Sequence, residues 1–124
     1  MIVGAVTDEL DPVVTIQVRD SNGAFHDFEV VVDTGFTGAV SLTPALVQRL
    51  NLTWFSREEG ILADGSRIAF DSFLANVLCD GCEQLTQICV MDGTPVIGMR
   101  GLNGFSIEID VRPHGQVRIH RPDH

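Results

Sequence analysis

Short segments of alternating apolar and polar residues run through most of the chain. Residues 14–19 read Val-Thr-Ile-Gln-Val-Arg, the period-two alternation of a half-buried strand. A second apolar segment runs from Phe25 to Val32, and the turn-forming residues Asp20 to Gly23 separate the two. We therefore expect residues 14–32 to form a β-hairpin.

Two more hairpins and a helix are predicted along the rest of the chain. Asp64-Gly65 would turn a hairpin over residues 61–77, and Asp80-Gly81 would turn the next one. Between the first two hairpins, Thr43 can cap a short helix that begins at Pro44. Its buried stripe would be Leu46, Val47 and Leu50. One helical turn is expected over residues 99–102, and strands near 107–111 and 117–119.

The number and length of these segments indicate the fold class. Many short strands separated by turns, with one or two short helices, are typical of an all-β domain that is closed or sandwiched. The chain has 124 residues, of which 44% are hydrophobic. That is enough for one core and too short for two ordinary domains. We expect a single domain over residues 1–124.

The charge balance disfavours several classes of partner. Seventeen acidic residues face eight basic ones, the formal net charge is −9, and all eight basic residues are scattered arginines. Binding to nucleic acid or to an anionic membrane requires concentrated positive charge, so we expect neither partner. We see no signal segment and no run of about 18 apolar residues, and we expect a cytoplasmic protein.

The cysteines and histidines lack the spacing of a metal site. Cys79 and Cys82 flank the predicted Asp80-Gly81 turn, and Cys89 follows. A structural zinc site needs four ligands, and a redox C-x-x-C motif is usually found where a helix begins. We expect three reduced cysteines, no metal and no cofactor.

Residues 30–35 read Val-Val-Val-Asp-Thr-Gly and are the segment that most suggests chemistry. Three β-branched residues predict a buried strand. Asp33 would follow it at the edge of the core, where burial and neighbouring charges affect ionisation. A lone Asp-Thr-Gly is more often a turn than an active site. Two later segments make the pattern more specific: a hairpin tip at Ala63–Ser66, and Val96-Ile97-Gly98.

These motifs carry a family resemblance. Asp-Thr-Gly-Phe-Thr-Gly, Leu-Ala-Asp-Gly-Ser and Ile-Gly-Met occur in the order found in retropepsin-like aspartic peptidases, and the chain most resembles their small bacterial and archaeal members. The resemblance covers residues 14–119. It implies an acid-protease fold, a closed β-barrel with one Asp-Thr-Gly lobe per chain. Because the motif occurs once, it also implies a homodimeric aspartic endopeptidase, acting on peptides or proteins, in which each subunit contributes Asp33.

The resemblance assigns a role to each residue of the motifs. The catalytic motif would be Asp33, Thr34 and Gly35. The two Asp33 carboxylates would share a proton and activate water, Thr34 would brace the pair, and Gly35 would admit the substrate backbone. The remaining residues would bind substrate: Ala63, Asp64, Gly65 and Ser66 as a flap, Phe36 as an apolar wall, and Val96 and Ile97 behind the catalytic loop.

Two departures from the family pattern leave other functions open. Phe36 stands where the family commonly has Ala or Ser, and Met99 stands where retroviral members have Arg. The alternatives are a catalytically inactive dimeric binding or regulatory module and a narrow processing peptidase for one partner protein. We expect dimer contacts near Ile2–Val6 and Val117–His120. We also expect apolar substrate side chains in the groove, and a solvated loop at Glu58-Glu59.

Overall fold

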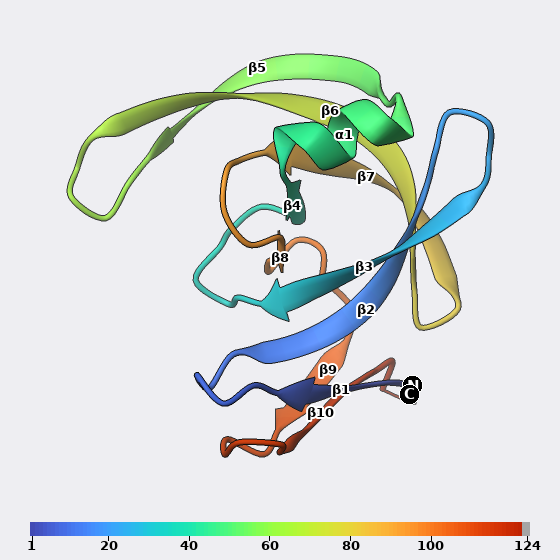
Figure 1. The fold of residues 1–124 in the computed structure, drawn as a ribbon, viewed down its shortest axis with the longest axis vertical. Coiled ribbons are helices and arrows are strands. Elements are labelled where there is room, and N and C mark those ends of the chain that lie inside the picture. The colour runs from blue at the N-terminus through green and yellow to red at the C-terminus, as the bar shows by residue number, and fades with distance from the viewer. Residues whose placement is uncertain (123–124) are drawn as a thin grey trace.

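The computed structural model describes residues 1–122 and is mostly β-sheet, as expected, with one short helix (Figure 1). In chain order the elements are β1 (Ile2–Val6), β2 (Pro12–Arg19), β3 (Phe25–Val32), β4 (Val40–Leu42), α1 (Pro44–Leu50), β5 (Thr53–Ile61), β6 (Arg67–Cys79), β7 (Cys82–Val90), β8 (Val96–Ile97), β9 (Ser106–Ile109) and β10 (Gln116–His120). Among the described residues, no helix has the length and apolar character needed to cross a membrane.

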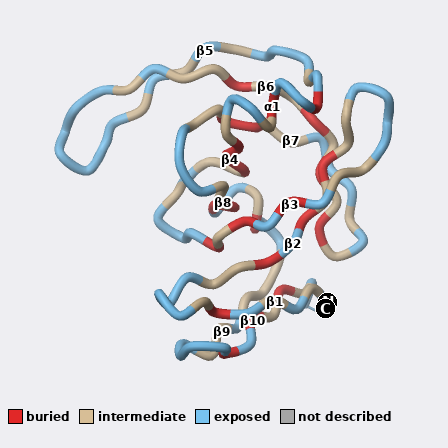
Figure 2. The backbone as a smooth tube through the Cα atoms, viewed as in Figure 1, coloured by how far each residue is buried: buried red, intermediate tan, exposed pale blue. Residues whose placement is uncertain are grey.

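The described strands form one sheet whose pairings return on themselves. The order is β5-β6-β7-β4-β8-β3-β2-β1-β10-β9, and β6 also pairs with β2. The pairings therefore run in a ring through β2, β3, β8, β4, β7 and β6. Each of these six strands contributes to a single buried core (Figure 2), for example through Val14, Val30, Ile97, Leu42, Ile88 and Val77.

Two of the predicted hairpins are confirmed with their turns. β2 pairs with β3 from Val13↔Val31 to Arg19↔Phe25. β6 pairs with β7 down to Cys79↔Cys82, and both turn residues between them have positive φ, 50° at Asp80 and 73° at Gly81. That combination is the tight turn that matches the twist of a two-residue hairpin. All three cysteines are free thiols.

The predicted boundary of the remaining hairpin is wrong. β5 begins at Thr53, eight residues before the expected start at Ile61, and pairs with β6 from Thr53↔Leu74 to Ile61↔Arg67. Glu58 and Glu59 consequently lie within a strand and not in a solvated loop. The reason is that β5 is largely exposed, so it lacks the apolar alternation that marks a half-buried strand. Backbone pairing to β6 is what defines it.

The short helix forms as the sequence predicts. The Thr43 hydroxyl accepts a hydrogen bond from the Leu46 N–H at 3.4 Å, and Pro44 occupies the first turn. Val47 and Leu50 are buried and Leu46 is half-buried, which matches the expected stripe. The helix thereby closes one side of the core.

The terminal strands pair with each other inside one chain. β1 pairs antiparallel with β10 from Ile2↔Ile119 to Ala5↔Gln116, and β10 also pairs with β9. Both backbone edges of β10 are therefore occupied. Any contact between subunits through these strands has to use side chains or the outer edge of β9 rather than the edges of β10.

Candidate active site

Asp33 is placed by a strand that runs through the core. Val30 and Val32 of β3 are buried, and Asp33 is the first residue after that strand. Its backbone N–H donates to the Ile97 carbonyl oxygen at 3.0 Å, which extends the parallel pairing of β3 with β8 by one residue. The side chain is exposed, and its Oδ1 accepts a hydrogen bond from the Gly35 N–H at 2.9 Å. The core therefore fixes the backbone, while the carboxylate remains accessible.

The loop after Asp33 is held against the segment after β8 by backbone hydrogen bonds. The Gly98 N–H donates to Ala39 at 2.8 Å, the Met99 N–H to Phe36 at 2.9 Å and the Arg100 N–H to Gly38 at 3.2 Å. Gly98 is buried under this loop, and a Cβ at Gly98 would lie 2.5 Å from the Gly38 carbonyl oxygen. The close approach requires glycine at this position. Gly98 therefore allows the loop to lie directly against the segment after β8.

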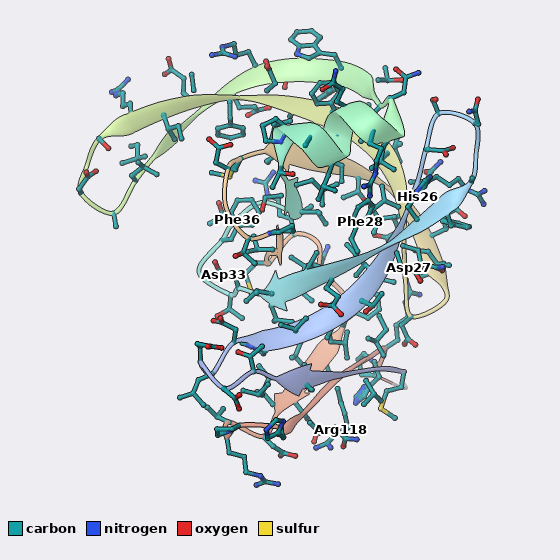
Figure 3. All side chains as sticks on the ribbon, in the orientation of Figure 1. His26, Asp27, Phe28, Asp33, Phe36 and Arg118 are labelled. Atoms are coloured by element: carbon teal, nitrogen blue, oxygen red, sulfur yellow. The ribbon has the colours of Figure 1, made fainter. Side chains whose placement is uncertain are left out.

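A cleft of about 550 Å³ separates this loop from the β5–β6 hairpin. The hairpin projects beyond the rest of the molecule on the side where β3 ends (Figure 1), and Asp33 and Phe36 lie on the loop beneath it (Figure 3). The loop contributes residues 35–39 to the cleft, and the hairpin contributes residues 58–63, Ile68 and Phe70. The floor includes Gln87, Cys89 and Arg100.

The structure brings together only part of the predicted site. Gly35, Phe36 and Ala63 line the cleft, while Asp33 and Thr34 are exposed just before it on the same loop. Ile97 is buried and lines a smaller neighbouring pocket of about 210 Å³. Val96 is half-buried and pairs with Val31 and Ser41, outside both cavities.

The other predicted flap residues form the exposed tip of the β5–β6 hairpin. Gly65 has a φ of +86°, as the tight turn requires. Asp64 accepts hydrogen bonds from the Ser66 hydroxyl at 2.6 Å and from the Ser66 N–H at 2.8 Å. Both bonds lower the pKa of Asp64, and the bond from the hydroxyl has the larger effect. The tip is thus an ordered turn whose polar groups bond within it.

The cleft contains a polar network that sequence reasoning missed. Glu58 Oε1 accepts hydrogen bonds from the Ser56 hydroxyl at 2.7 Å and from Gln87 Nε2 at 2.8 Å. Gln87 Nε2 also donates to the hydroxyl of Ser72, which is fully buried. The hydrogen bonds from Ser56 and Gln87, followed by the nearby charge of Arg100, lower the pKa of Glu58. The alternation of Ser56, Glu58 and Gly60 could have indicated one face of a strand. Because none of these residues is a large apolar one, the segment resembles a loop.

The cleft offers neither an activated cysteine nor a metal site among the described residues. Burial raises the pKa of the Cys89 thiol, and the Glu58 charge raises it further, whereas a reactive cysteine needs a lowered pKa. Among residues 1–122, no group of three or more His, Cys, Asp or Glu side chains is arranged to hold a metal ion. Asp33 is an exposed carboxylate beside the cleft, and its backbone is fixed by the pairing of β3 with β8.

Comparison with models of protein families, with curated proteins and with solved structures gave no match for this chain.

Proposed function

We propose that the chain is an aspartic endopeptidase that acts as a homodimer, with Asp33 of each subunit in one shared active site. The observation that carries the proposal is the position of Asp33. It follows a buried strand, on a loop fixed by the Gly98 segment, next to a cleft covered by a projecting hairpin. Peptide hydrolysis by paired carboxylates needs this combination of a fixed acid, an open groove and a cover.

A second copy is required because the chain has one Asp-Thr-Gly. A single exposed carboxylate cannot supply both an acid and a base. Two carboxylates brought together by a two-fold axis would share one proton, since adjacent like charges do not both ionise at low cost. The exposure of Asp33 in one chain leaves it free to meet the partner's Asp33.

Two exposed apolar residues lie in turns on the same side of the molecule as Asp33 and favour a dimer face there. The Val13↔Val31 pairing places the β1–β2 turn beside the end of β3. That turn exposes Leu10 at a φ of 67°, an unfavourable backbone conformation for a leucine. The neighbouring β9–β10 turn exposes Val111, and its His114 ring nitrogen lies 3.3 Å from the Asp8 carboxylate of the β1–β2 turn. Both turns lie on the same side of the molecule as the projecting hairpin (Figure 1).

The proposed chemistry needs only water and the two carboxylates. The ionised Asp33 takes a proton from water while the water oxygen bonds to the peptide carbonyl carbon. The protonated Asp33 donates a hydrogen bond to the carbonyl oxygen. The tetrahedral intermediate collapses when the C–N bond breaks and the nitrogen receives a proton from the pair. Closure of the hairpin over the peptide would exclude bulk water from this step.

The proposal extends to the fold and the location. The ring of strand pairings would be the closed barrel of one acid-protease lobe, with the β5–β6 hairpin as its flap. The cytosol would keep the three free thiols reduced.

The test is cleavage of a diverse peptide library between pH 3 and pH 8, at protein concentrations where sedimentation shows a dimer. We expect the wild type to cleave and to be blocked by a statine-type transition-state mimic. Asp33→Asn should remove all cleavage, because its side chain can act neither as base nor as shared acid. The matched control is Asp27→Asn, an exposed carboxylate earlier on β3 that accepts a hydrogen bond from Gln17 at 2.9 Å.

Other outcomes separate the alternatives. A dimer without any cleavage would favour the binding or regulatory module, and cleavage of a single protein but of no library peptide would favour the narrow processing enzyme. Activity that persists in Asp33→Asn, or a protein that stays monomeric, would overturn the proposed active site.

A further inference from the structure

Polar groups line part of the cleft, although an apolar groove was expected. Phe36, Ile68 and Phe70 provide apolar wall, but Glu58, Gln87 and Arg100 line the same cavity. A charged or amide group in a substrate groove is costly to desolvate unless a ligand group replaces the water it loses. The polar lining therefore points to a substrate side chain of matching chemistry, if the cleft is the substrate groove proposed above.

Glu58 is held in one orientation. Its Oε1 bonds to Ser56 and Gln87, and Gln87 is itself anchored by Ser72, whose hydroxyl is 2.9 Å from that of Ser56. Within the described residues, Oε2 has no hydrogen-bond partner from the protein. A carboxylate fixed by this network with one oxygen unused is a preorganised acceptor.

Arg100 supplies the complementary donor. It lies on the segment that holds the Asp33 loop, and it lines both the cleft and the neighbouring 210 Å³ pocket. Its charge acts on Glu58, yet the two side chains make no direct ion pair, and within residues 1–122 the guanidinium has no other hydrogen-bonded partner. A fixed acceptor and an unpaired cation thus stand near each other in one cavity.

We propose that Glu58 and Arg100 are specificity-determining residues of a subsite for a carboxamide side chain, Asn or Gln. The amide NH₂ of such a side chain would donate to Glu58 Oε2, and its carbonyl oxygen would accept from Arg100. A carboxamide satisfies both groups without adding charge, while an acidic side chain would face Glu58 and a basic one would face Arg100. The inference rests on the proposed function for the identity of the ligand as a peptide.

Affinity selection tests the subsite without requiring catalysis. A randomised octapeptide library is applied to the Asp33→Asn dimer, and the retained peptides are sequenced. We expect enrichment of Asn and Gln at one position. Adding Glu58→Gln should shift that position toward Asp and Glu, and adding Arg100→Gln should shift it toward Lys and Arg. Each shift should be roughly tenfold, since one charge-assisted hydrogen bond is replaced.

Glu29→Gln provides the matched control, because Glu29 is exposed on β3 and outside the cleft. It should leave the selected sequences unchanged. Apolar residues at every selected position, identical selections by all variants, or retention of no peptide would each overturn the subsite.

The same peptides are then offered to the protein with Asp33 intact. Selection of carboxamides without any cleavage would keep the subsite and reject the peptidase, whereas cleavage with only apolar preferences would do the reverse.

Discussion

The two sides of the cleft are built by different means. On one side, the Asp33 loop is tied to the Gly98 segment by backbone hydrogen bonds, and its neighbours approach so closely that one added methyl would overlap them. On the other side, residues 61–67 of the β5–β6 hairpin are all exposed and bond mainly to their partners across the hairpin (Figure 2). One wall is fixed by the core, and the other extends away from it.

This difference matches the division of labour that the proposed reaction needs. A catalytic carboxylate has to keep its position within fractions of an ångström, so its loop has to be built on rigid elements. A cover has to admit an extended chain and close over it, so it belongs to the least stable part of the fold. The polar network of Glu58 marks the boundary, because it attaches the base of the hairpin to Ser72 and Gln87 of the ring.

The largest effect is expected from Gly98→Ala. The new methyl would overlap the carbonyl oxygens of Phe36 and Gly38, which cannot move without breaking the bonds that hold the loop. Overpacking of this kind costs about 2–3 kcal/mol, measured as the free energy of unfolding in urea. Gly60→Ala on the hairpin is the control, because its nearest neighbour is a Phe70 ring carbon at 3.4 Å. Equal losses in the two variants would contradict the comparison.

Ser72→Ala should have the next largest effect. The fully buried hydroxyl joins Ser56 to Gln87, and its removal costs about 1 kcal/mol for a lost buried hydrogen bond. Ser66→Ala at the exposed tip removes a hydroxyl that also bonds to a side chain. It should lower the free energy of unfolding by less than half as much. If both variants unfold like the wild type, the base of the hairpin is not anchored as described.

A smaller effect is expected from Glu58→Gln, and it should depend on pH. The folded chain lowers the pKa of Glu58 below its ordinary value of 4.5, so the ionised form is bound more favourably in the folded than in the unfolded state. This contribution is complete above pH 4.5 and is lost as the pH falls through the lowered pKa. The gap in unfolding free energy between wild type and variant should therefore be present at pH 7 and close toward pH 3. A gap that stays constant across this range would contradict the assigned cause.

The smallest change in global stability is expected from Gly65→Ala. Alanine at a φ of +86° costs about 1 kcal/mol, but the exposed tip can open without unfolding the core. Urea unfolding should therefore shift by less than about 0.5 kcal/mol, while the amides of residues 61–67 exchange faster with solvent. Gly81→Ala lies in the turn that joins the paired ends of β6 and β7. It should lower the free energy of unfolding by the full amount of about 1 kcal/mol. Similar values for the two variants would show that the tip unfolds together with the core.

Sequence reasoning succeeded where burial controls the residue pattern. The β2–β3 hairpin, the cap at Thr43 and the turn at Asp80 were all predictable, because apolar alternation and turn chemistry are local signals. It failed for β5, whose residues are mostly exposed and whose strand exists through pairing with β6. Glu58 was missed for the same reason, since its partner Gln87 comes from β7 and Gln87 in turn bonds to Ser72 of β6.

The continuity of β6 has a consequence for how this protein can diverge. Its 13 residues, about 40 Å of extended chain, reach without a break from the exposed hairpin end to the core-paired Cys79. Lengthening both arms of the hairpin equally at Gly65 preserves the alternation below it, so Ser72 keeps facing Ser56. A one-residue insertion in one arm alone would move the side chains beyond it to the opposite face, unless a bulge such as the irregularity between Trp54 and Ser56 absorbs it. Symmetric lengthening or shortening of the hairpin would therefore leave the pairing near the core unchanged and give the cleft a new outer wall.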